Sequence, residues 1–397
     1  FRSHPSVILW SIGNEIDYPN DPYCHPLFKT ATGNNDKNKP ITERIYDPNR
    51  PNAERLVTIA RKLASIVKKL DARPVTAALA LPELSNITGL SACLDVVGYN
   101  YKEELYETDH QKYPGMVILG TENTKGLKEW QTVMEHEFIS GQFLWTGIDF
   151  LGETQGWPSH GSHSGLLDLA GFKKPAFFFR KSLWCEEPMA ELFTAPPERD
   201  HKAYLDSLLV TPAWIGRPGL EVCVICFTNC VEAELWVNGR SAGKRTMYES
   251  TEGFLVWKVP YEKGEIRVTA THANGRVCER SLKSIGLASE IRLTCEESMD
   301  SCDPSDILHV VATIADSDGN TVHAADNEIH ITVKGAVLKG LENGNLEDTT
   351  PYNCTYRKAY NGRLLIYIKP DGTADTVTVT ASAQGLKTAG IAIPITH

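Results

Sequence analysis

The sequence predicts a multidomain protein in which a parallel α/β region is followed by two all-β modules. From residue 1 to about residue 185, apolar strands alternate with helical stretches, which is typical of parallel strands joined by crossover helices. After Trp184 the pattern changes to short alternating strands separated by Gly, Asn and Asp, which is typical of β-sandwiches.

The α/β region contains five candidate strands and one strong helix. The strands are expected at residues 7–12, 75–81, 94–101, 116–122 and 142–149. The apolar run of residues 7–10 reads as a strand buried on both faces. Between the first two strands, apolar side chains recur at helical spacing with polar residues opposite, which predicts an amphipathic helix lying on the sheet. Its expected buried face is Leu56, Ile59, Leu63, Ile66 and Leu70.

The remainder predicts two β-sandwiches of immunoglobulin-like size. Residues 220–227, 232–237 and 264–271 alternate as strands, and Asn238 with Gly239 forms a typical hairpin turn. A second run begins near Ser289 with the segments IRLTC, ILHVVATIAD, EIHITVKG, RLLIYIKP and TVTVTASA.

Composition narrows the class of ligand. The chain has 397 residues, 42% of them hydrophobic and 23% charged, and no run of 18 apolar residues predicts a membrane span. The formal net charge of -10, with both signs interspersed, disfavours nucleic acid or an anionic membrane as a partner. A neutral or weakly charged ligand fits better.

The ten cysteines leave the redox compartment open, because they do not form the dense pattern of a small disulfide scaffold. Cys223, Cys226 and Cys230 form the tightest group. In a strand, however, Cys223 and Cys226 would point to opposite faces, so the sequence predicts buried thiols here and not zinc ligands. We expect neither a metal nor another cofactor.

Two glutamates end candidate strands in the same way. Gly13 precedes Glu15 at the end of the first strand, and Gly120 precedes Glu122 at the end of the fourth. The carboxyl ends of parallel strands meet at one edge of a sheet, and a pair of carboxylates there suits cleavage of a glycosidic bond. On spacing alone, two unrelated loop glutamates remain an equal alternative.

Other strand ends carry aromatic and amide side chains. One strand ends with Tyr99, Asn100 and Tyr101, and another reaches Trp145 and Asp149. Rings stack on the C–H faces of sugars, and amides bind hydroxyl groups. Each of these residues alone could equally fill a core.

The stretch SHPSVILWSIGNE resembles the acid/base strand of glycoside hydrolase family 2, the family of β-galactosidases, β-glucuronidases and β-mannosidases. The order of the segments DVVGYNY, VILGTE, QFLWTGIDFLGE and GLLDLAGFKK is similar to that family as well. VEAELWVNGRSAGK and LKGLENGN resemble its accessory β-sandwiches, so the likeness covers essentially the whole chain.

The resemblance implies roles for five residues. Glu15 matches the general acid/base and Glu122 the nucleophile. Asn14 matches the residue that binds the sugar 2-hydroxyl, Tyr101 the tyrosine that hydrogen-bonds the nucleophile, and Trp145 a wall of the sugar subsite. The family retains anomeric configuration, which implies carboxyl groups ~5 to 5.5 Å apart.

The same resemblance implies an incomplete (β/α)8 barrel. The expected domains are a partial barrel over residues 1–186, holding strands four to eight, and two Ig-like β-sandwiches over residues 187–287 and 288–397. The first three strands and the family's N-terminal domains are absent from this sequence, so we expect a missing N-terminal portion as a partner. The chain alone is then expected to be inactive.

The implied substrate is a terminal β-galactoside. Glucuronidases of the family carry an Asn-x-Lys motif after the eighth strand, and SHGSHSGLLDLAGFKK has none there. Asn123-Thr124-Lys125 has the right letters but follows the nucleophile, so its match is a coincidence. Family resemblance favours a periplasmic or secreted location. The alternative function is a carbohydrate-binding or adhesive protein with a non-catalytic barrel remnant.

Overall fold

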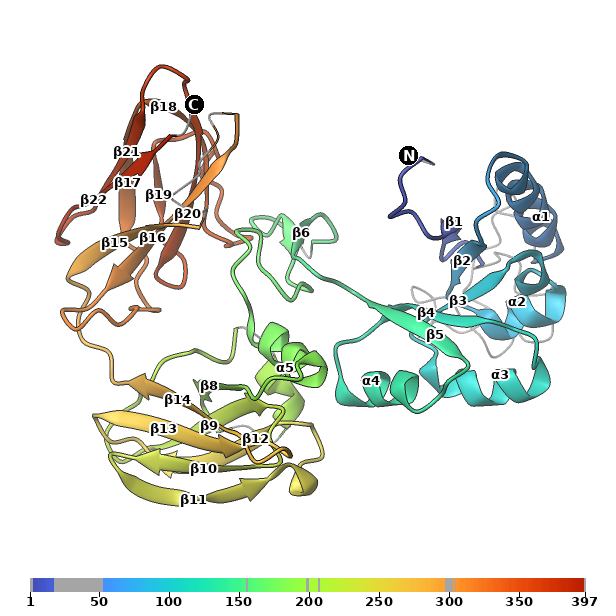
Figure 1. Cartoon of the computed structure of the whole chain (residues 1–397), viewed down its shortest axis with the longest axis horizontal. Coiled ribbons are helices and arrows are strands. Elements are labelled where there is room, and N and C mark those ends of the chain that lie inside the picture. The colour runs from blue at the N-terminus through green and yellow to red at the C-terminus, as the bar shows by residue number, and fades with distance from the viewer. Residues whose placement is uncertain are drawn as a thin grey trace. The chain divides into compact units, whose positions relative to one another are not determined.

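The computed structural model describes residues 3–17, 53–154, 156–197, 200–205, 208–296, 303 and 305–395. The chain divides into two compact units, Phe1–Trp145 and Thr146–His397 (Figure 1). The first unit contains the parallel strands, and the second contains the β-sandwiches.

The first unit is built on a five-stranded sheet whose strands follow one another in space as they do in sequence. The strands are β1 (Trp10–Asn14), β2 (Val75–Leu79), β3 (Val96–Asn100), β4 (Ile118–Asn123) and β5 (Ile139–Leu144). Each pairs in parallel with the next. The predicted set of five parallel strands is therefore confirmed, and all five carboxyl ends lie at one edge of the sheet.

Helices connect these strands. They are α1 (Ala53–Leu70), α2 (Pro82–Thr88), α3 (Tyr106–Lys112) and α4 (Leu127–Met134), with short 3-10 turns at Ser91–Cys93 and Glu103–Leu105. Leu79, Tyr99, Tyr106 and Ile118 are fully buried between helices and sheet. This core fixes the strand ends that carry the candidate site.

The buried face of α1 differs from the prediction. The helix buries Leu56 together with Val57, Ala60 and Ala64, whereas the other four predicted core residues are exposed. Those four are Ile59, Leu63, Ile66 and Leu70. The helix has two apolar stripes, and the small side chains of the alanine stripe let its backbone lie close to the sheet. Periodicity could not show which stripe would face inward.

Two strand predictions also need correction. The run of residues 7–10 is not buried on both faces, since Ile8 is 71% exposed and the strand begins only at Trp10. β1 is an edge strand that pairs with β2 alone in the sheet as described, so one side of it has no neighbouring strand. At the other edge, β5 ends at Leu144, five residues before Asp149.

The second unit begins with a short hairpin and a helix. The hairpin pairs β6 (Phe150–Leu151) with β7 (Gly161–Ser162), and α5 (Pro175–Trp184) follows it. α5 then leads into the first sandwich, against whose aromatic side chains it packs Phe178 and Phe179. Among the described residues of the chain, no helix has both the length and the apolar character to span a membrane.

The first sandwich packs a three-stranded sheet on a four-stranded one. The smaller sheet holds β8 (Ala190–Ala195), β9 (Glu221–Thr228) and β12 (Leu255–Pro260). The larger holds β10 (Glu232–Val237), β11 (Arg240–Thr246), β13 (Glu265–Thr271) and β14 (Val277–Lys283). Asn238 and Gly239 both have positive φ, as the predicted hairpin turn requires. Cys223, Cys226 and Cys230 are buried, which confirms the expected environment of these thiols.

The second sandwich packs two four-stranded sheets face to face. One holds β15 (Glu290–Cys295), β16 (Leu308–Ala315), β18 (Ala336–Glu342) and β20 (Arg363–Pro370). The other holds β17 (Glu328–Lys334), β19 (Tyr356–Lys358), β21 (Thr376–Ser382) and β22 (Ala389–Pro394). Alternate residues of the central strands, such as β9 and β16, enter the two cores, as the period-two patterning predicted. The exact domain boundaries stay a prediction.

Candidate functional site

Four of the five residues singled out in the sequence lie at the carboxyl ends of strands in the first unit. Asn14 ends β1 and Glu15 follows it. Tyr101 follows β3, and Glu122 is the second-last residue of β4. β2 lies between β1 and β3, and β3 pairs directly with β4. The parallel sheet thus gathers side chains that are distant in sequence.

Two of these residues have a backbone conformation that is unusual for non-glycine residues. φ is 50° at Glu15 and 53° at Tyr101, which is the left-handed region. Such a conformation costs on the order of 1 to 3 kcal/mol and persists only where surrounding contacts hold it. The Glu15 N–H donates to the carbonyl of Ala78 at 2.7 Å, and the Tyr101 N–H donates to the carbonyl of Glu122 at 2.8 Å. Both strand ends are therefore tied to the neighbouring strand.

A buried amide connects the two candidate carboxylates. Asn100 is 2% exposed, and its Nδ2 lies 3.2 Å from Glu122 Oε2 and 3.4 Å from Glu15 Oε1. The same nitrogen donates to Asn14 Oδ1 at 3.1 Å. The two carboxylate oxygens can be no farther apart than the sum of their distances to this nitrogen. The carboxyl groups of Glu15 and Glu122 therefore lie close together.

The orientation of the Asn100 amide is fixed from behind. Thr121 donates its hydroxyl to Asn100 Oδ1 at 2.7 Å, which turns the NH2 group toward the carboxylates. Gly98 makes room for this contact, because a Cβ at that position would lie 2.4 Å from the Thr121 methyl carbon. The glycine in DVVGYNY thus permits the close approach that sets the amide.

The candidate nucleophile accepts a short hydrogen bond from Tyr101. The Tyr101 hydroxyl lies 2.6 Å from Glu122 Oε1, a length typical of a hydroxyl bound to a carboxylate. Glu122 is half-buried, and each of its two carboxyl oxygens receives a hydrogen-bond donor. Hydrogen bonds of this kind favour the ionised form of a carboxyl group.

Trp145 lies next to this group at the end of β5. Its N–H donates to the carbonyl of Asn123 at 3.0 Å, which places it beside the residue that follows Glu122. Its side chain is 37% exposed, so part of the indole is available for contact. The structure thus brings all five predicted residues to the same edge of the sheet, with Trp145 at its margin.

Sequence reasoning gave Asn100 no specific role. It appeared only as one of several amides at strand ends, yet it contacts three of the five predicted residues. Its role follows from its position opposite Glu122 in the pairing of β3 with β4. That pairing contains a register shift, which periodicity does not reveal.

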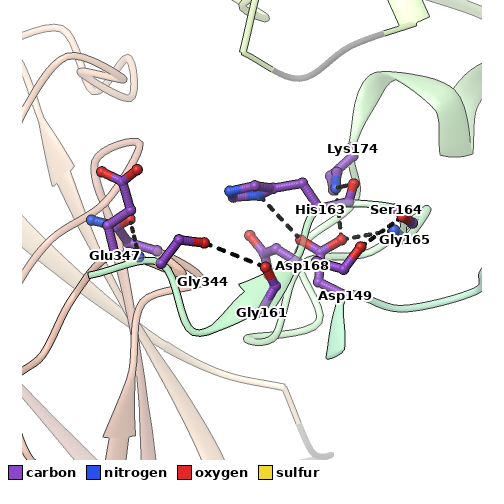
Figure 2. Close-up of polar contacts among 12 residues, drawn as sticks. Asp149, Gly161, His163, Ser164, Gly165, Asp168, Lys174, Gly344 and Glu347 are labelled. Carbon is purple, nitrogen blue, oxygen red and sulfur yellow. Dashed lines mark hydrogen bonds and ion pairs between the residues drawn. The ribbon is translucent and has the colours of Figure 1, made fainter. Parts of the chain in front are cut away.

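A second polar cluster lies in the second unit and has a different character. Lys174 donates to Asp149 Oδ1 at 2.8 Å and to the carbonyl of His163 at 2.7 Å, and the Gly165 N–H also donates to Asp149 Oδ1 (Figure 2). Asp149 and Lys174 are both buried. A carboxylate held by an ammonium and a backbone N–H joins two chain segments, so we interpret this cluster as structural. Among the residues that the structure describes, no group of three or more His, Cys, Asp or Glu side chains is arranged to hold a metal ion.

Comparison with known families gives two matches, both in the second unit. Residues 291–392 match the model of the glycoside hydrolase family 2 C-terminal domain 5, and residues 219–279 match a domain of unknown function, DUF4982. They correspond to the second and first sandwiches, respectively.

Individual relatives extend the likeness over the first unit. A β-galactosidase of Bacteroides ovatus is 30% identical over 99% of this chain and 50% of its own length. A β-glucuronidase of Bacteroides fragilis is 33% identical over 36% of this chain and 19% of its own length. A solved glycosyl hydrolase family 2 member from Bacteroides cellulosilyticus is similar over 99% of this chain and 49% of its own, with 28% identity and a TM-score of 0.80. The chain spans about half the length of the first and third of these relatives.

Proposed function

Because the chain belongs to glycoside hydrolase family 2, we propose that it carries both catalytic carboxylates of a retaining β-glycosidase. Glu15 acts as the general acid/base and Glu122 as the nucleophile. Glu122 attacks the anomeric carbon while Glu15 protonates the departing oxygen, and a covalent glycosyl-enzyme forms. Glu15 then removes a proton from water, which displaces Glu122 and releases the sugar.

The Asn100 bridge is the observation that carries this proposal. Two carboxylates that contact one amide nitrogen, at 3.2 and 3.4 Å, lie close enough to act on opposite ends of one bond. Their largest possible separation, the sum of these distances, accommodates the ~5 to 5.5 Å spacing of retaining enzymes. An amide N–H also gives the pair a neutral donor, which lets both carboxylates remain close together.

Three further residues complete the proposed site. The Tyr101 hydroxyl stabilises the ionised nucleophile, which must leave as a carboxylate in the second step. Asn14 binds the sugar 2-hydroxyl, where hydrogen bonds strengthen toward the transition state. The exposed part of the Trp145 indole forms a wall of the sugar subsite by stacking on C–H groups.

The proposed substrate is a neutral β-galactoside. A β-galactosidase is 30% identical over 99% of the chain, whereas two putative β-glucuronidases of Formosa agariphila cover 97% of it at a lower identity of 24%. Two lysines follow the segment SHGSHSG within ten residues: Lys173 is exposed and lies over the Phe177 ring, whereas Lys174 is buried and bonded to Asp149. The segment SHGSHSGLLDLAGFKK contains no Asn-x-Lys motif, which holds the sugar carboxylate in the glucuronidases that the sequence resembles.

The test uses the full-length protein, including any residues that precede Phe1. We expect turnover of nitrophenyl β-galactoside to exceed turnover of nitrophenyl β-glucuronide by at least about 100-fold in kcat/KM. The reverse preference would overturn the proposed substrate. Saturable sugar binding without turnover of any nitrophenyl glycoside would instead support the alternative, a carbohydrate-binding protein.

The 397-residue chain alone is proposed to be inactive. Two features of the described residues support this proposal: among them, β1 pairs on one side only, and α1 leaves an apolar stripe exposed. In a closed barrel, further strands and helices would cover both. Catalysis depends on placement to within about an ångström, so an open sheet should lose it. Full activity from the mass-verified chain would contradict the proposal, and recovery on adding the missing N-terminal portion would support it.

A further inference from the structure

Asp17, two residues beyond Glu15, is a buried carboxylate that the proposed mechanism does not use. It is 1% exposed, and it accepts three hydrogen bonds from residues that the structure describes. The N–H groups of Ala80 and Leu81 donate to it at 3.0 and 2.7 Å, and the Ser85 hydroxyl donates at 3.1 Å. Burial raises the pKa of Asp17, while these donors lower it. Because burial of a carboxylate costs solvation energy, these hydrogen bonds are needed to hold the Asp17 side chain in its buried position.

The donors to Asp17 belong to one short stretch of chain. Ala80 and Leu81 follow β2, and Ser85 lies in α2, whose first turn begins at Leu81. Asp17 therefore ties the chain beyond β1 to the junction of β2 and α2. The anchor lies at the same edge of the sheet as the candidate site.

Glu15 is held by the same stretch. Its N–H donates to the carbonyl of Ala78, two residues before the first N–H that binds Asp17. The segment from Glu15 to Asp17 is thus clamped at both ends to residues 78–81. Between these anchors Glu15 keeps its left-handed backbone, with φ at 50°.

We propose that Asp17 is a positioning residue, which holds the strained backbone of Glu15 so that its carboxyl group faces the nucleophile. The inference rests on the proposed function, because it assigns Asp17 a task only if Glu15 is the acid/base. Loss of one anchor would let Glu15 relax toward negative φ. Relaxation would redirect its Cα–Cβ bond and move Oε1 away from Asn100, which it now contacts at 3.4 Å.

The main test is Asp17→Asn in the full-length protein. Asparagine has nearly the same volume, but its NH2 group would face the N–H of Ala80 or Leu81 and lose one anchor bond. Two substrates are compared: a dinitrophenyl galactoside, whose leaving group needs no proton, and a methyl galactoside, whose leaving group does. We expect kcat/KM for the methyl galactoside to fall about 10- to 100-fold more than for the dinitrophenyl galactoside.

Asp95→Asn is the matched control. Asp95 Oδ2 accepts a hydrogen bond from the Val75 N–H at 2.8 Å and pairs with Lys68 at 2.7 Å, so it anchors the opposite end of β2. The same chemical change there should leave the ratio of the two kcat/KM values unchanged. An equal shift in both variants would mean that the ratio reports general loosening, and would overturn the role of Asp17.

Glu15→Gln separates the two possible failures. If Glu15→Gln leaves the ratio unchanged, the acid/base assignment is wrong, and the inference falls with it. If Glu15→Gln changes the ratio and a folded Asp17→Asn protein does not, only the positioning role is wrong. Should Asp17→Asn fail to fold, Ser85→Ala removes the longest of the three bonds and must shift the ratio in the same direction, by about 2- to 5-fold. An unchanged ratio in Ser85→Ala would then overturn the proposal.

Hydrogen exchange gives a second readout in the 397-residue chain, without substrate. Asp17→Asn should accelerate exchange of the Glu15 amide, whose N–H is bonded to Ala78, by about 10-fold or more. Asp95→Asn should not. Unchanged protection of the Glu15 amide in Asp17→Asn would show that Asp17 does not hold this backbone.

Discussion

The carboxylates of the two units are held in different ways. Glu122, in the first unit, is half-buried and receives the Tyr101 hydroxyl and the Asn100 amide. Asp149, in the second, is 2% exposed and receives the Lys174 ammonium and a backbone N–H (Figure 2). Neutral donors leave the negative charge of a carboxylate uncompensated, whereas a buried ammonium neutralises it. The first arrangement suits a group that forms a bond, and the second suits a group that joins two segments.

The largest expected difference between the two carboxylates is in turnover, when the negative charge of Glu122 or of Asp149 is removed without changing the shape of the side chain. Glu122→Gln in the full-length protein should lower kcat by at least about 1,000-fold, because the amide cannot form the glycosyl-enzyme. Its thermal unfolding should be nearly unchanged. Steady-state kinetics and calorimetry on the same preparation test both parts.

Asp149→Asn is the matched control for Glu122→Gln. It should lower stability, while the folded fraction keeps most of its turnover. This result is the opposite of the one expected for Glu122→Gln. Near-normal turnover in a folded Glu122→Gln protein would remove Glu122 from the mechanism.

The acid/base carboxylate should respond to a different test. Glu15→Ala should still form the glycosyl-enzyme from a dinitrophenyl galactoside but release it slowly, so the intermediate accumulates. Azide needs no base and should restore turnover by at least about 10-fold, because it attacks the anomeric carbon as Glu122 departs. The expected product is a glycosyl azide of β-configuration, identified by NMR. An α-azide would contradict the retaining mechanism.

The buried ion pair of Asp149 and Lys174 should contribute more to the unfolding free energy than an exposed ion pair does. Asp149→Asn leaves the Lys174 ammonium buried without its counter-charge, which should cost about 3 to 5 kcal/mol of unfolding free energy. Urea unfolding of the 397-residue chain measures this. Glu279→Gln breaks the half-exposed pair with Arg267 and should change little, because solvent screens such pairs. Equal effects of the two substitutions would remove the distinction between buried and exposed pairs.

Much of the fold could be predicted from sequence because strands follow periodic patterns. The parallel strands and both sandwiches were read correctly from alternation and turn residues such as Asn238-Gly239. The buried face of α1 was not, because the helix has two apolar stripes and packing against the sheet chooses the one with small side chains. Likewise, the short strand β5 ends before Asp149 because Asp149 belongs to the buried cluster of the second unit.

The candidate site was predictable in its residues but not in its connections. Glu15 and Glu122 could be found because strand ends collect chemistry in a parallel sheet. Asn100 and Asp17 could not be assigned roles, since their contacts depend on strand register and on backbone conformation. Contacts between strands distant in sequence leave no local pattern.

The smallest expected effect is a pH dependence of the second unit. Burial raises the pKa of Asp168 to about 6 from an ordinary value of 3.8, while Arg363 opposes and Asp149 adds to this shift. Between these two pH values the folded state holds a proton that the unfolded state has lost. The unfolding free energy should therefore fall as pH rises from about 4 to 6, by on the order of 2 to 3 kcal/mol from this group.

Asp168→Asn should remove that part of the pH dependence in urea unfolding of the 397-residue chain. Asparagine keeps the oxygen that accepts the N–H groups of Ala170 and Phe172, so the turn is preserved. His323 acts in the opposite direction: burial lowers its pKa to about 4, so its contribution destabilises the fold as pH falls below about 6.5. Both proteins in the comparison, the parent and the Asp168→Asn variant, therefore also carry His323→Gln. If Asp168→Asn then shows the same slope between pH 4 and 6 as its parent, Asp168 is not the buried acid that titrates there.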